Sequence, residues 1–324
     1  MNRKNKYTES FIIKKYLKKL NFKKIESLNF DNDAGFLKSK KNKNIIVTND
    51  TILENVDFFK NDPAESVANK IVIYNLSDIS AMGAYPYAYT LSLSLPKNKT
   101  TTWLKKFTDK LLSLQKKYNF FLIGGDLSKS NKIVISANFY GYISKDKILT
   151  RNGANINDDI WVTGTIGDSF IGLKYLQKKI ILKKKFQNYY VGKYLYPSLK
   201  CIGYKINNFA SSAIDISDGF YGDLEILLKQ KKLGANIQLS SIPLSIKTKQ
   251  LIKNKSINIK SLLEAGDDYQ LIFTANARYS RRIKRISQQY NINITNVGKI
   301  VKKRGIYINN KKIRFTNKSF QHFA

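Results

Sequence analysis

Short apolar runs alternate with amphipathic segments along most of this chain, and that alternation limits the folds available to it. Apolar residues recur at helical spacing over residues 8–20, 64–82 and 103–118. Strand-like runs lie between and after them, at residues 44–49, 87–95, 120–123, 133–143, 160–163, 212–216, 271–274 and 292–300. Strands and helices in alternation predict an α/β architecture of the α+β type.

The pattern restarts after a loop-like segment at residues 151–154. A chain of 324 residues is long enough for two domains, and 43% hydrophobic residues can fill two cores. We therefore predict one domain at residues 1–150 and a second at residues 151–324.

The supply of cysteine and histidine excludes several kinds of site. The chain has one cysteine, Cys201, and one histidine, His322. An internal disulfide is therefore excluded, and a Cys/His metal site and a Ser-His-Asp triad are strongly disfavoured. The first residues lack the apolar core of a signal peptide, and no run of about 18 uncharged apolar residues occurs. We expect a cytoplasmic protein without a membrane span.

The formal net charge of +34 raises the alternative of a nucleic-acid-binding protein. The basic residues are mostly lysines, spread along the whole chain, and lysine, asparagine, isoleucine, tyrosine and phenylalanine are used heavily together. That combination is typical of an A+T-rich coding sequence. The charge is better explained by composition bias than by function, and we expect no specific nucleic acid partner.

Acidic residues are scarce in this chain, so their positions carry information. Many of the 23 acids stand in small clusters beside glycine or at the ends of apolar runs. Four carboxylate positions stand out, at Asp50, Asp78, Asp126 and Asp215 with Asp218, and Asp33 is a candidate for a fifth. Hard cations such as Mg²⁺ prefer oxygen ligands and commonly bind phosphates beside carboxylates. Asp78 falls inside a predicted helix, so it cannot be an N-cap. The acids predict a metal-dependent enzyme that handles phosphate groups.

Two glycine-containing segments follow predicted strands. Gly124-Gly125-Asp126 would let a phosphate approach the backbone closely, but no Gly-Lys-Ser/Thr follows, so it is not a Walker loop. Residues 164–167 precede a predicted helix and fit either an anion site or a tight turn. Arg151 is the one arginine between Arg3 and Arg278, which suggests a bidentate phosphate contact.

The order and spacing of these segments resemble the thiamine-monophosphate kinase family, of the aminoimidazole ribonucleotide synthetase superfamily. The stretches that carry the resemblance are NDTILENVDFF (49–59), NLSDISAMGAYP (75–86), LIGGD (122–126), LTRNGA (149–154), VTGTIGDS (162–169), SSAIDISDG (211–219) and AGDDYQL (265–271). The resemblance implies a two-domain aminoimidazole ribonucleotide synthetase-like fold and a homodimer built on the N-terminal sheets. It also implies direct transfer of the ATP γ-phosphate to thiamine monophosphate, with several Mg²⁺ ions and thiamine diphosphate as product.

Family roles transfer to single positions of this chain. Metal-ligand positions are Asp33, Thr48, Asn49, Asp50, Asp78, Asp126, Asp215 and Asp218. ATP-contact positions are Gly125, Asp126, Arg151 and Ser217, and substrate positions are Asp57, Asp267 and Phe320. We expect Asp50, Asp78, Asp126 and Asp215 to be the catalytic set, because they would hold the Mg²⁺ ions that bridge the two substrates.

Some positions depart from the family pattern. Residues 29–35 read Asn-Phe-Asp-Asn-Asp-Ala-Gly and lack two glycines and one aspartate of the usual nucleotide loop. Asp57 replaces a histidine, Asp267 a glutamate and Asn49 a threonine. We expect an active kinase with weakened substrate affinity. The alternatives are another ATP-using enzyme of the superfamily, such as a selenophosphate synthetase, or an inactive relative.

Overall fold

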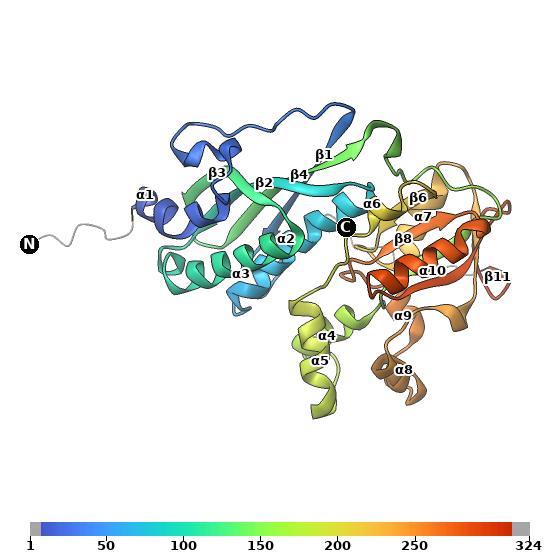
Figure 1. Ribbon diagram of the computed structural model, residues 1–324. Coiled ribbons are helices and arrows are strands. Elements are labelled where there is room, and N and C mark those ends of the chain that lie inside the picture. The colour runs from blue at the N-terminus through green and yellow to red at the C-terminus, as the bar shows by residue number, and fades with distance from the viewer. Residues whose placement is uncertain (1–7, 313–324) are drawn as a thin grey trace, which may run out of the picture. The chain divides into compact units, whose positions relative to one another are not determined.

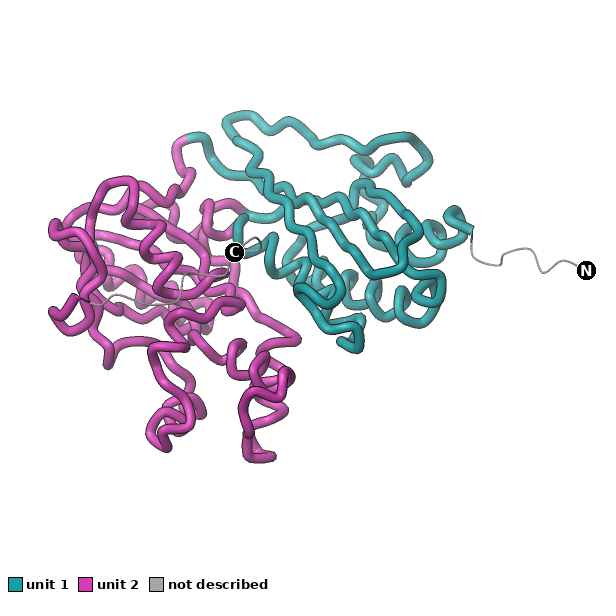
Figure 2. The backbone as a smooth tube through the Cα atoms, turned by 180° about the vertical axis from the view of Figure 1, so that it is seen from behind, with its two compact units in different colours: residues 1–79, 85–145 teal, residues 80–84, 146–324 magenta. Residues whose placement is uncertain are grey.

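The computed structural model of the protein describes residues 8–312. The chain divides into two compact units (Figure 2): unit 1 comprises residues 1–79 and 85–145, and unit 2 comprises residues 80–84 and 146–324. Each unit has its own sheet with packed helices, which confirms the predicted mixed α/β class. The assignment of functions to two domains at residue 150 stays a prediction. No helix within residues 8–312 is both long and apolar enough to cross a membrane.

Unit 1 contains a four-stranded sheet in the order β1-β4-β2-β3. Its strands are β1 (Lys43–Leu53), β2 (Tyr85–Leu95), β3 (Phe121–Lys129) and β4 (Val134–Ser144). Strand β4 runs antiparallel to both neighbours, whereas β2 and β3 are parallel. Parallel neighbours need a crossover, which helix α3 (Thr102–Tyr118) supplies.

Helices α2 (Ala64–Ala81) and α3 lie together along the sheet of unit 1 (Figure 1). Alternate residues of β4, namely Ile135, Ala137 and Phe139, are fully buried. Phe139 stacks on the buried ring of Tyr89 with ring centroids 4.9 Å apart. This alternation fixes which strand residues face the core, since a shift by one residue would expose them all.

The N-terminal segment is helical, as predicted, but the type of helix changes twice along it. It comprises the α-helix α1 (Glu9–Ile12), the π-helical η1 (Ile13–Leu17) and the 3₁₀-helices η2 (Lys18–Asn21) and η3 (Ile25–Phe30). The side-chain amide of Gln115 on α3 donates a 2.6 Å hydrogen bond to the carbonyl of Leu20. Because Gln115 is fully buried, this bond fixes the segment firmly to α3.

Unit 2 contains a seven-stranded sheet in the order β11-β10-β7-β9-β5-β8-β6. Its strands are β5 (Asp159–Thr163), β6 (Ala210–Asp215), β7 (Gly234–Ile237), β8 (Leu271–Ala275), β9 (Ile294–Val301), β10 (Gly305–Ile308) and β11 (Lys311–Lys312). Only β10 and β7 pair in parallel among these. The central strand β5 is buried along its whole length.

Helices α7 (Phe220–Lys229) and α10 (Ser280–Gln289) pack in two separate cores on this sheet, and the other helices of unit 2 are α6 (Gly203–Ile206) and α9 (Ile259–Leu263). Helices α4 (Asp168–Leu176), α5 (Lys184–Leu195) and α8 (Ile246–Lys253) pack against one another in a further cluster. Short 3₁₀ turns are η4 (Lys97–Lys99) and η5 (Lys145–Lys147), followed in unit 2 by η6 (Leu239–Ser241) and η7 (Ala277–Tyr279). Successive residues of β8 are buried in two different hydrophobic cores. Ile272 packs in the core that includes Leu224 of α7, and Phe273 packs in the core that includes Ile283 of α10.

A buried aspartate joins three segments of unit 2. The carboxylate of Asp168, which is 2% exposed, accepts hydrogen bonds from four hydroxyl groups. The donors are Thr165 at 3.1 Å, Tyr189 at 2.8 Å, Ser245 at 2.8 Å and Thr248 at 2.7 Å. Asp168 therefore ties the start of α4 to α5 and to the start of α8, and it satisfies polar groups that water cannot reach.

We predict that Asp168→Asn lowers the free energy of unfolding by about 2–3 kcal/mol, because the amide nitrogen cannot accept the hydroxyl donors. Urea denaturation measures this change. The matched control is Asp146→Asn, at an exposed position, which should change stability by no more than about 0.5 kcal/mol. Equal stability of the two variants would show that Asp168 does not hold these segments.

Candidate functional site

Three of the predicted metal positions lie on the helix-facing side of the unit 1 sheet. Thr48 and Asp50 are two residues apart on β1, so their side chains share a face. The hydroxyl of Thr48 donates a 2.5 Å hydrogen bond to the carboxylate of Asp78. Asp78 lies well inside α2, as the sequence predicted. The structure thus brings together oxygen donors from β1 and α2.

Asn49 lies on the other face of the same strand. Its side-chain amide donates to the side-chain oxygen of Asn138 at 2.9 Å and to the carbonyl of Ala137 at 3.3 Å. Asn138 in turn donates to the hydroxyl of Thr90 at 3.1 Å, which makes a polar row across three strands. The structure does not bring the Asn49 side chain beside those of Thr48 and Asp50.

Asp126 shares the face of Asn49. Register pairs Asn138 with Thr90 and Thr90 with Gly124, so Gly124 continues the polar row onto β3. Asp126 is two residues further along β3 and therefore projects from the same side. It is exposed there. The predicted unit 1 ligands thus fall into two groups, one on each face of the sheet.

The glycines before Asp126 lie within β3, which continues to Lys129; the prediction that this strand ends at residue 123 was wrong. A Cβ atom on Gly125 would stand 2.0 Å from the carbonyl oxygen of Leu91, so strand pairing itself requires this glycine. A Cβ on Gly124 would meet no heavy atom within 4 Å. Of these two glycines, Gly124 is the one that leaves open space for a ligand.

A cavity of about 150 Å³ in unit 1 adjoins this strand. Asp33, Gly125 and Asp126 line it together, although they come from separate segments of the sequence. The structure therefore places the altered loop at residues 29–35 beside the glycine-containing strand, as a nucleotide site would require.

The loop keeps an unusual backbone without its glycines. Leu28, Asn29 and Phe30 have φ angles of 43°, 60° and 60°, in the left-handed region. Asparagine tolerates this region, but leucine and phenylalanine do so at a cost of about 1–2 kcal/mol each. The surrounding packing maintains a conformation that glycine would adopt freely.

In unit 2, the predicted residue Asp215 ends β6, and Ser217 and Asp218 lie in the loop between β6 and α7. Asp223, which the sequence analysis missed, holds this loop: its carboxylate accepts the backbone N–H groups of Asp218 and Gly219, both at 3.1 Å. Burial, together with the charges of Asp215 and Asp218, raises the pKa of the Asp223 carboxyl to about 8. An aspartate in the first turn of a helix was the available signal.

Asp267 lies beside Ser217. Its backbone N–H donates to the Ser217 carbonyl at 2.9 Å, and Tyr269 N–H donates to Ile216 at 2.8 Å. A Cβ on Gly266 would stand 2.1 Å from the Ser217 carbonyl oxygen, so glycine is required for this approach. The structure thus unites a predicted ATP residue with a predicted substrate residue.

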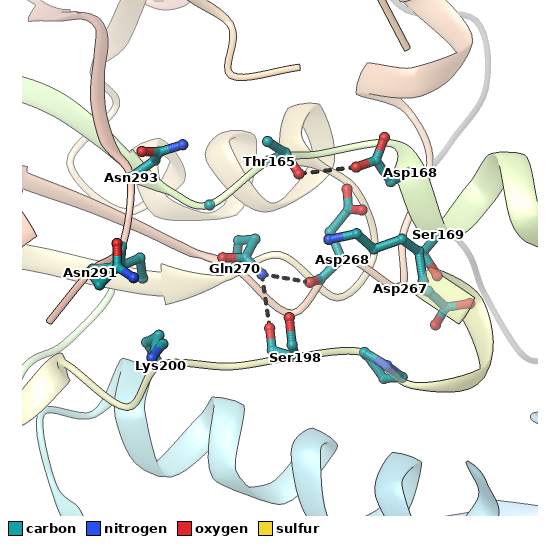
Figure 3. A pocket seen from close by; sticks show the side chains of 14 residues that line it. Thr165, Asp168, Ser169, Ser198, Lys200, Asp267, Asp268, Gln270, Asn291 and Asn293 are labelled. Atoms are coloured by element: carbon teal, nitrogen blue, oxygen red, sulfur yellow. Dashed lines mark hydrogen bonds between the residues drawn. The ribbon is translucent and has the colours of Figure 1, made fainter. Parts of the chain in front are cut away.

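A cavity of about 280 Å³ opens next to Asp267 (Figure 3). Asp268 and Gln270 lie on its wall, and Lys193 and Lys200 also line it. Burial raises the pKa of the Asp268 carboxyl well above its usual range.

In the turn at residues 164–167, a backbone N–H group that could bind an anion already makes an internal hydrogen bond. Asp268 accepts the N–H of Gly167 at 2.7 Å, and both Gly164 and Gly167 have positive φ angles of 61° and 81°. Of the two interpretations of this segment, the geometry favours the tight turn over an anion site.

The remaining predicted site residues are Arg151, Asp57 and Phe320. Arg151 is exposed in a turn of unit 2. The Asp57 carboxylate accepts the backbone N–H of Leu53 at 2.8 Å, so it helps to close its own turn. Phe320 lies outside the described residues.

The oxygen donors of unit 1 suit Mg²⁺, although no group of three acidic, histidine or cysteine side chains within residues 8–312 could hold a metal ion by itself. Mg²⁺ commonly binds through one or two carboxylates plus substrate phosphates. Asp78 and Asp50 beside the Thr48 hydroxyl provide hard oxygen donors of that kind. In unit 2, the acids around Asp223 also favour a neighbouring cation.

Comparison with known proteins gives consistent matches. Residues 31–143 match the family model of the AIR synthase related protein, N-terminal domain. The thiamine-monophosphate kinase of Buchnera aphidicola subsp. Acyrthosiphon pisum is 38% identical, over 98% of this chain and 99% of that protein. The crystal structure of thiamine-monophosphate kinase from Stenotrophomonas maltophilia K279a has a TM-score of 0.81 and 29% identity, covering 87% of this chain and 90% of that one. AaThiL complexed with AMPPCP and TMP has a TM-score of 0.78 and 27% identity, covering 88% and 89%.

The left-handed backbone at Leu28 is testable. We predict that Leu28→Gly is more stable than Leu28→Ala by about 1 kcal/mol, because alanine keeps the Cβ that crowds this conformation. Both variants remove the same half-exposed side chain, so alanine is the matched control. Paired urea denaturation curves give the difference. At an ordinary position the glycine variant would be the less stable one, and that order would contradict the assigned strain.

Proposed function

This chain belongs to the thiamine-monophosphate kinase family, and from that premise we propose how its residues serve the reaction. The enzyme phosphorylates thiamine monophosphate with ATP and yields thiamine diphosphate and ADP. The observation that carries the proposal is the bond between Thr48 and Asp78, with Asp50 on the same side of β1. A cytoplasmic location is part of the proposal.

The proposed role of Asp50, Asp78, Asp126 and Asp215 is to hold Mg²⁺ ions against the phosphates, with Asp33, Thr48, Asn49 and Asp218 as further ligands. Mg²⁺ would neutralise the charge that develops on the transferred phosphoryl group. The Thr48 hydroxyl fixes one oxygen of Asp78, so that its carboxylate orientation is set before substrates bind. Asn49, whose side chain points to the other face, would contribute its backbone carbonyl.

Substrate contacts are proposed for both units. Gly125, Asp126, Arg151 and Ser217 would contact ATP, and Asp267 and Phe320 the thiamine phosphate. Asp57, whose carboxylate is engaged by Leu53, would act through the shape of its turn. No general base is needed, because the acceptor phosphate is largely ionised at pH 7.

The first test measures ADP release from the purified protein with ATP and Mg²⁺. We expect release that requires thiamine monophosphate, with thiamine diphosphate as product, and none with free thiamine. Chelation of Mg²⁺ should abolish release, and added Mg²⁺ should restore it. A folded protein that binds ATP yet forms no thiamine diphosphate would contradict the proposal.

The proposed role of Asp126 can be tested with a substitution that removes only its charge. We predict that Asp126→Asn lowers turnover by roughly 100-fold, since it removes a charge from the proposed metal site. The free energy of unfolding should change by no more than about 0.5 kcal/mol, because the side chain is exposed. Asp146→Asn is the control and should keep full turnover. Near-normal turnover of Asp126→Asn would remove Asp126 from the site.

We propose a homodimer formed through the sheet of unit 1. Val47 is 60% exposed and Ile45 is 40% exposed, both on the face of β1 that turns away from Asp50. Apolar side chains on an exposed sheet face favour a protein partner.

The dimer proposal predicts that Val47→Asp produces monomers in sedimentation equilibrium. The control Ile181→Asp alters a side chain that is 99% exposed in unit 2, and it should leave the oligomeric state unchanged. A Val47→Asp protein that sediments as wild type would exclude this face.

A further inference from the structure

Unit 1 contains a fully buried lysine that has no part in the kinase roles assigned above. Lys70 lies in the second turn of α2 and is 1% exposed. Lysine is almost never fully buried unless its ammonium group is paired, because burial removes the hydration of the charge. An apolar side chain of similar length would fill the same space without that cost. The charge at position 70 therefore serves something other than packing.

The ammonium group of Lys70 is directed at the turn that follows β1. It donates a hydrogen bond of 2.9 Å to the backbone carbonyl of Asp57. Burial raises the pKa of the Asp62 carboxyl, and the charge of Lys70 opposes that rise. Asp62 in turn accepts the backbone N–H of Phe59 at 3.0 Å. Lys70 thus holds the turn directly and also interacts with the carboxylate that orders the next few residues.

We call residues 53–58 the substrate turn, because Asp57 occupies a proposed substrate position. The backbone N–H of Asp57 donates to the carbonyl of Leu53 at 3.0 Å, and its carboxylate accepts the N–H of Leu53 at 2.8 Å. The N–H of Asn55 donates to the carbonyl of Phe58 at 2.7 Å, and the Phe58 side chain is 2% exposed. These bonds close the turn on itself, and Lys70 ties the closed turn to α2.

We propose that Lys70 is a positioning residue for thiamine monophosphate, because it holds the substrate turn in its binding shape before the substrate arrives. The inference rests on the proposed kinase function. The Asp57 carboxylate is engaged within the turn, so the turn acts on the substrate through its shape. Lys70 fixes that shape at the carbonyl of the same residue. An ammonium group has three N–H donors, which allows it to hold this carbonyl and interact with Asp62 as well.

Helix α2 links the substrate turn to the proposed metal residues of unit 1. Asp78 of α2 accepts the hydroxyl of Thr48 on β1, and Lys70 of α2 holds the turn after β1. The two helix positions are eight residues apart, which is about 12 Å along a helix axis. One rigid helix therefore sets the spacing between the two groups. Phosphoryl transfer depends on such positioning more than on covalent chemistry by the protein.

The first experiment measures the kinetics of Lys70→Met, which keeps most of the side-chain length and removes the charge. We expect the KM for thiamine monophosphate to rise roughly 10-fold, the effect of losing one hydrogen bond from a charged group. The kcat and the KM for ATP should stay within about two-fold.

The matched control is Lys106→Met, at an exposed lysine of α3, which should leave all three values unchanged. An unchanged KM for thiamine monophosphate in Lys70→Met would overturn the positioning role. An equal rise of both KM values would also overturn it, because a loosened unit 1 would affect both substrates.

The second experiment measures amide hydrogen exchange in the whole protein without substrates. In wild type, the N–H groups of Leu53 and Asp57 should exchange roughly 100-fold more slowly than in an unstructured peptide. Lys70→Met should speed their exchange roughly 10-fold, and Lys106→Met should not. Wild-type amides that exchange as fast as an unstructured peptide would overturn the preformed turn, even if Lys70→Met did not fold.

The two experiments separate this inference from the kinase proposal. Hydrogen exchange needs no activity, so it decides whether Lys70 holds the substrate turn even in a protein that forms no thiamine diphosphate. Such a protein contradicts the kinase function. An active kinase in which Lys70→Met changes neither the KM for thiamine monophosphate nor the exchange of Leu53 and Asp57 contradicts the role of Lys70 alone.

Discussion

The close approach of β3 to β2 at Gly125 is the constraint from which the geometry of unit 1 follows. The Leu91 carbonyl occupies the space that a side chain would need there, so the two strands can pair through this point only with glycine. The pairing carries β3 onward to Lys129. As a result, Asp126 projects from a regular strand beside the cavity that holds Asp33.

The alternation of side chains along β1 then separates predicted ligand positions that are adjacent in the sequence. Thr48 and Asp50 face α2, and Asn49 and Asp126 face the other way. Residues 48–50 were predicted as one group of ligands, although successive side chains of a strand point to opposite faces. The predicted place of Asp78 inside a helix is confirmed, because an acidic residue within an apolar helical pattern is a strong signal. The helices over 64–82 and 103–118 were also predicted correctly, because a long helix shows the spacing of its apolar residues within its own sequence.

What the sequence could not reveal depends on contacts between distant segments. The scarcity of acids suggested that most clusters serve metal ions, yet Asp168 and Asp268 are buried and hold hydroxyl or backbone groups in place. Their partners are up to 101 residues away along the chain. Composition cannot distinguish a carboxylate that binds a cation from one that accepts internal hydrogen bonds. The left-handed backbone at Leu28–Phe30 was equally hidden, because nothing in those side chains requires it.

The A+T bias of the coding sequence acts against glycine, so the glycines that remain in this chain can be examined for structural requirements. Every glycine codon begins with two guanines, so drift toward A+T removes glycine wherever another residue is tolerated, as at Asn29. Gly125, Gly153 and Gly266 resist replacement because a Cβ would lie within 2.1 Å of a backbone oxygen. Gly124 has no such neighbour and no positive φ angle. Gly192 of α5 is equally open, so what distinguishes Gly124 is its place on the wall of the cavity that Asp33 and Asp126 also line.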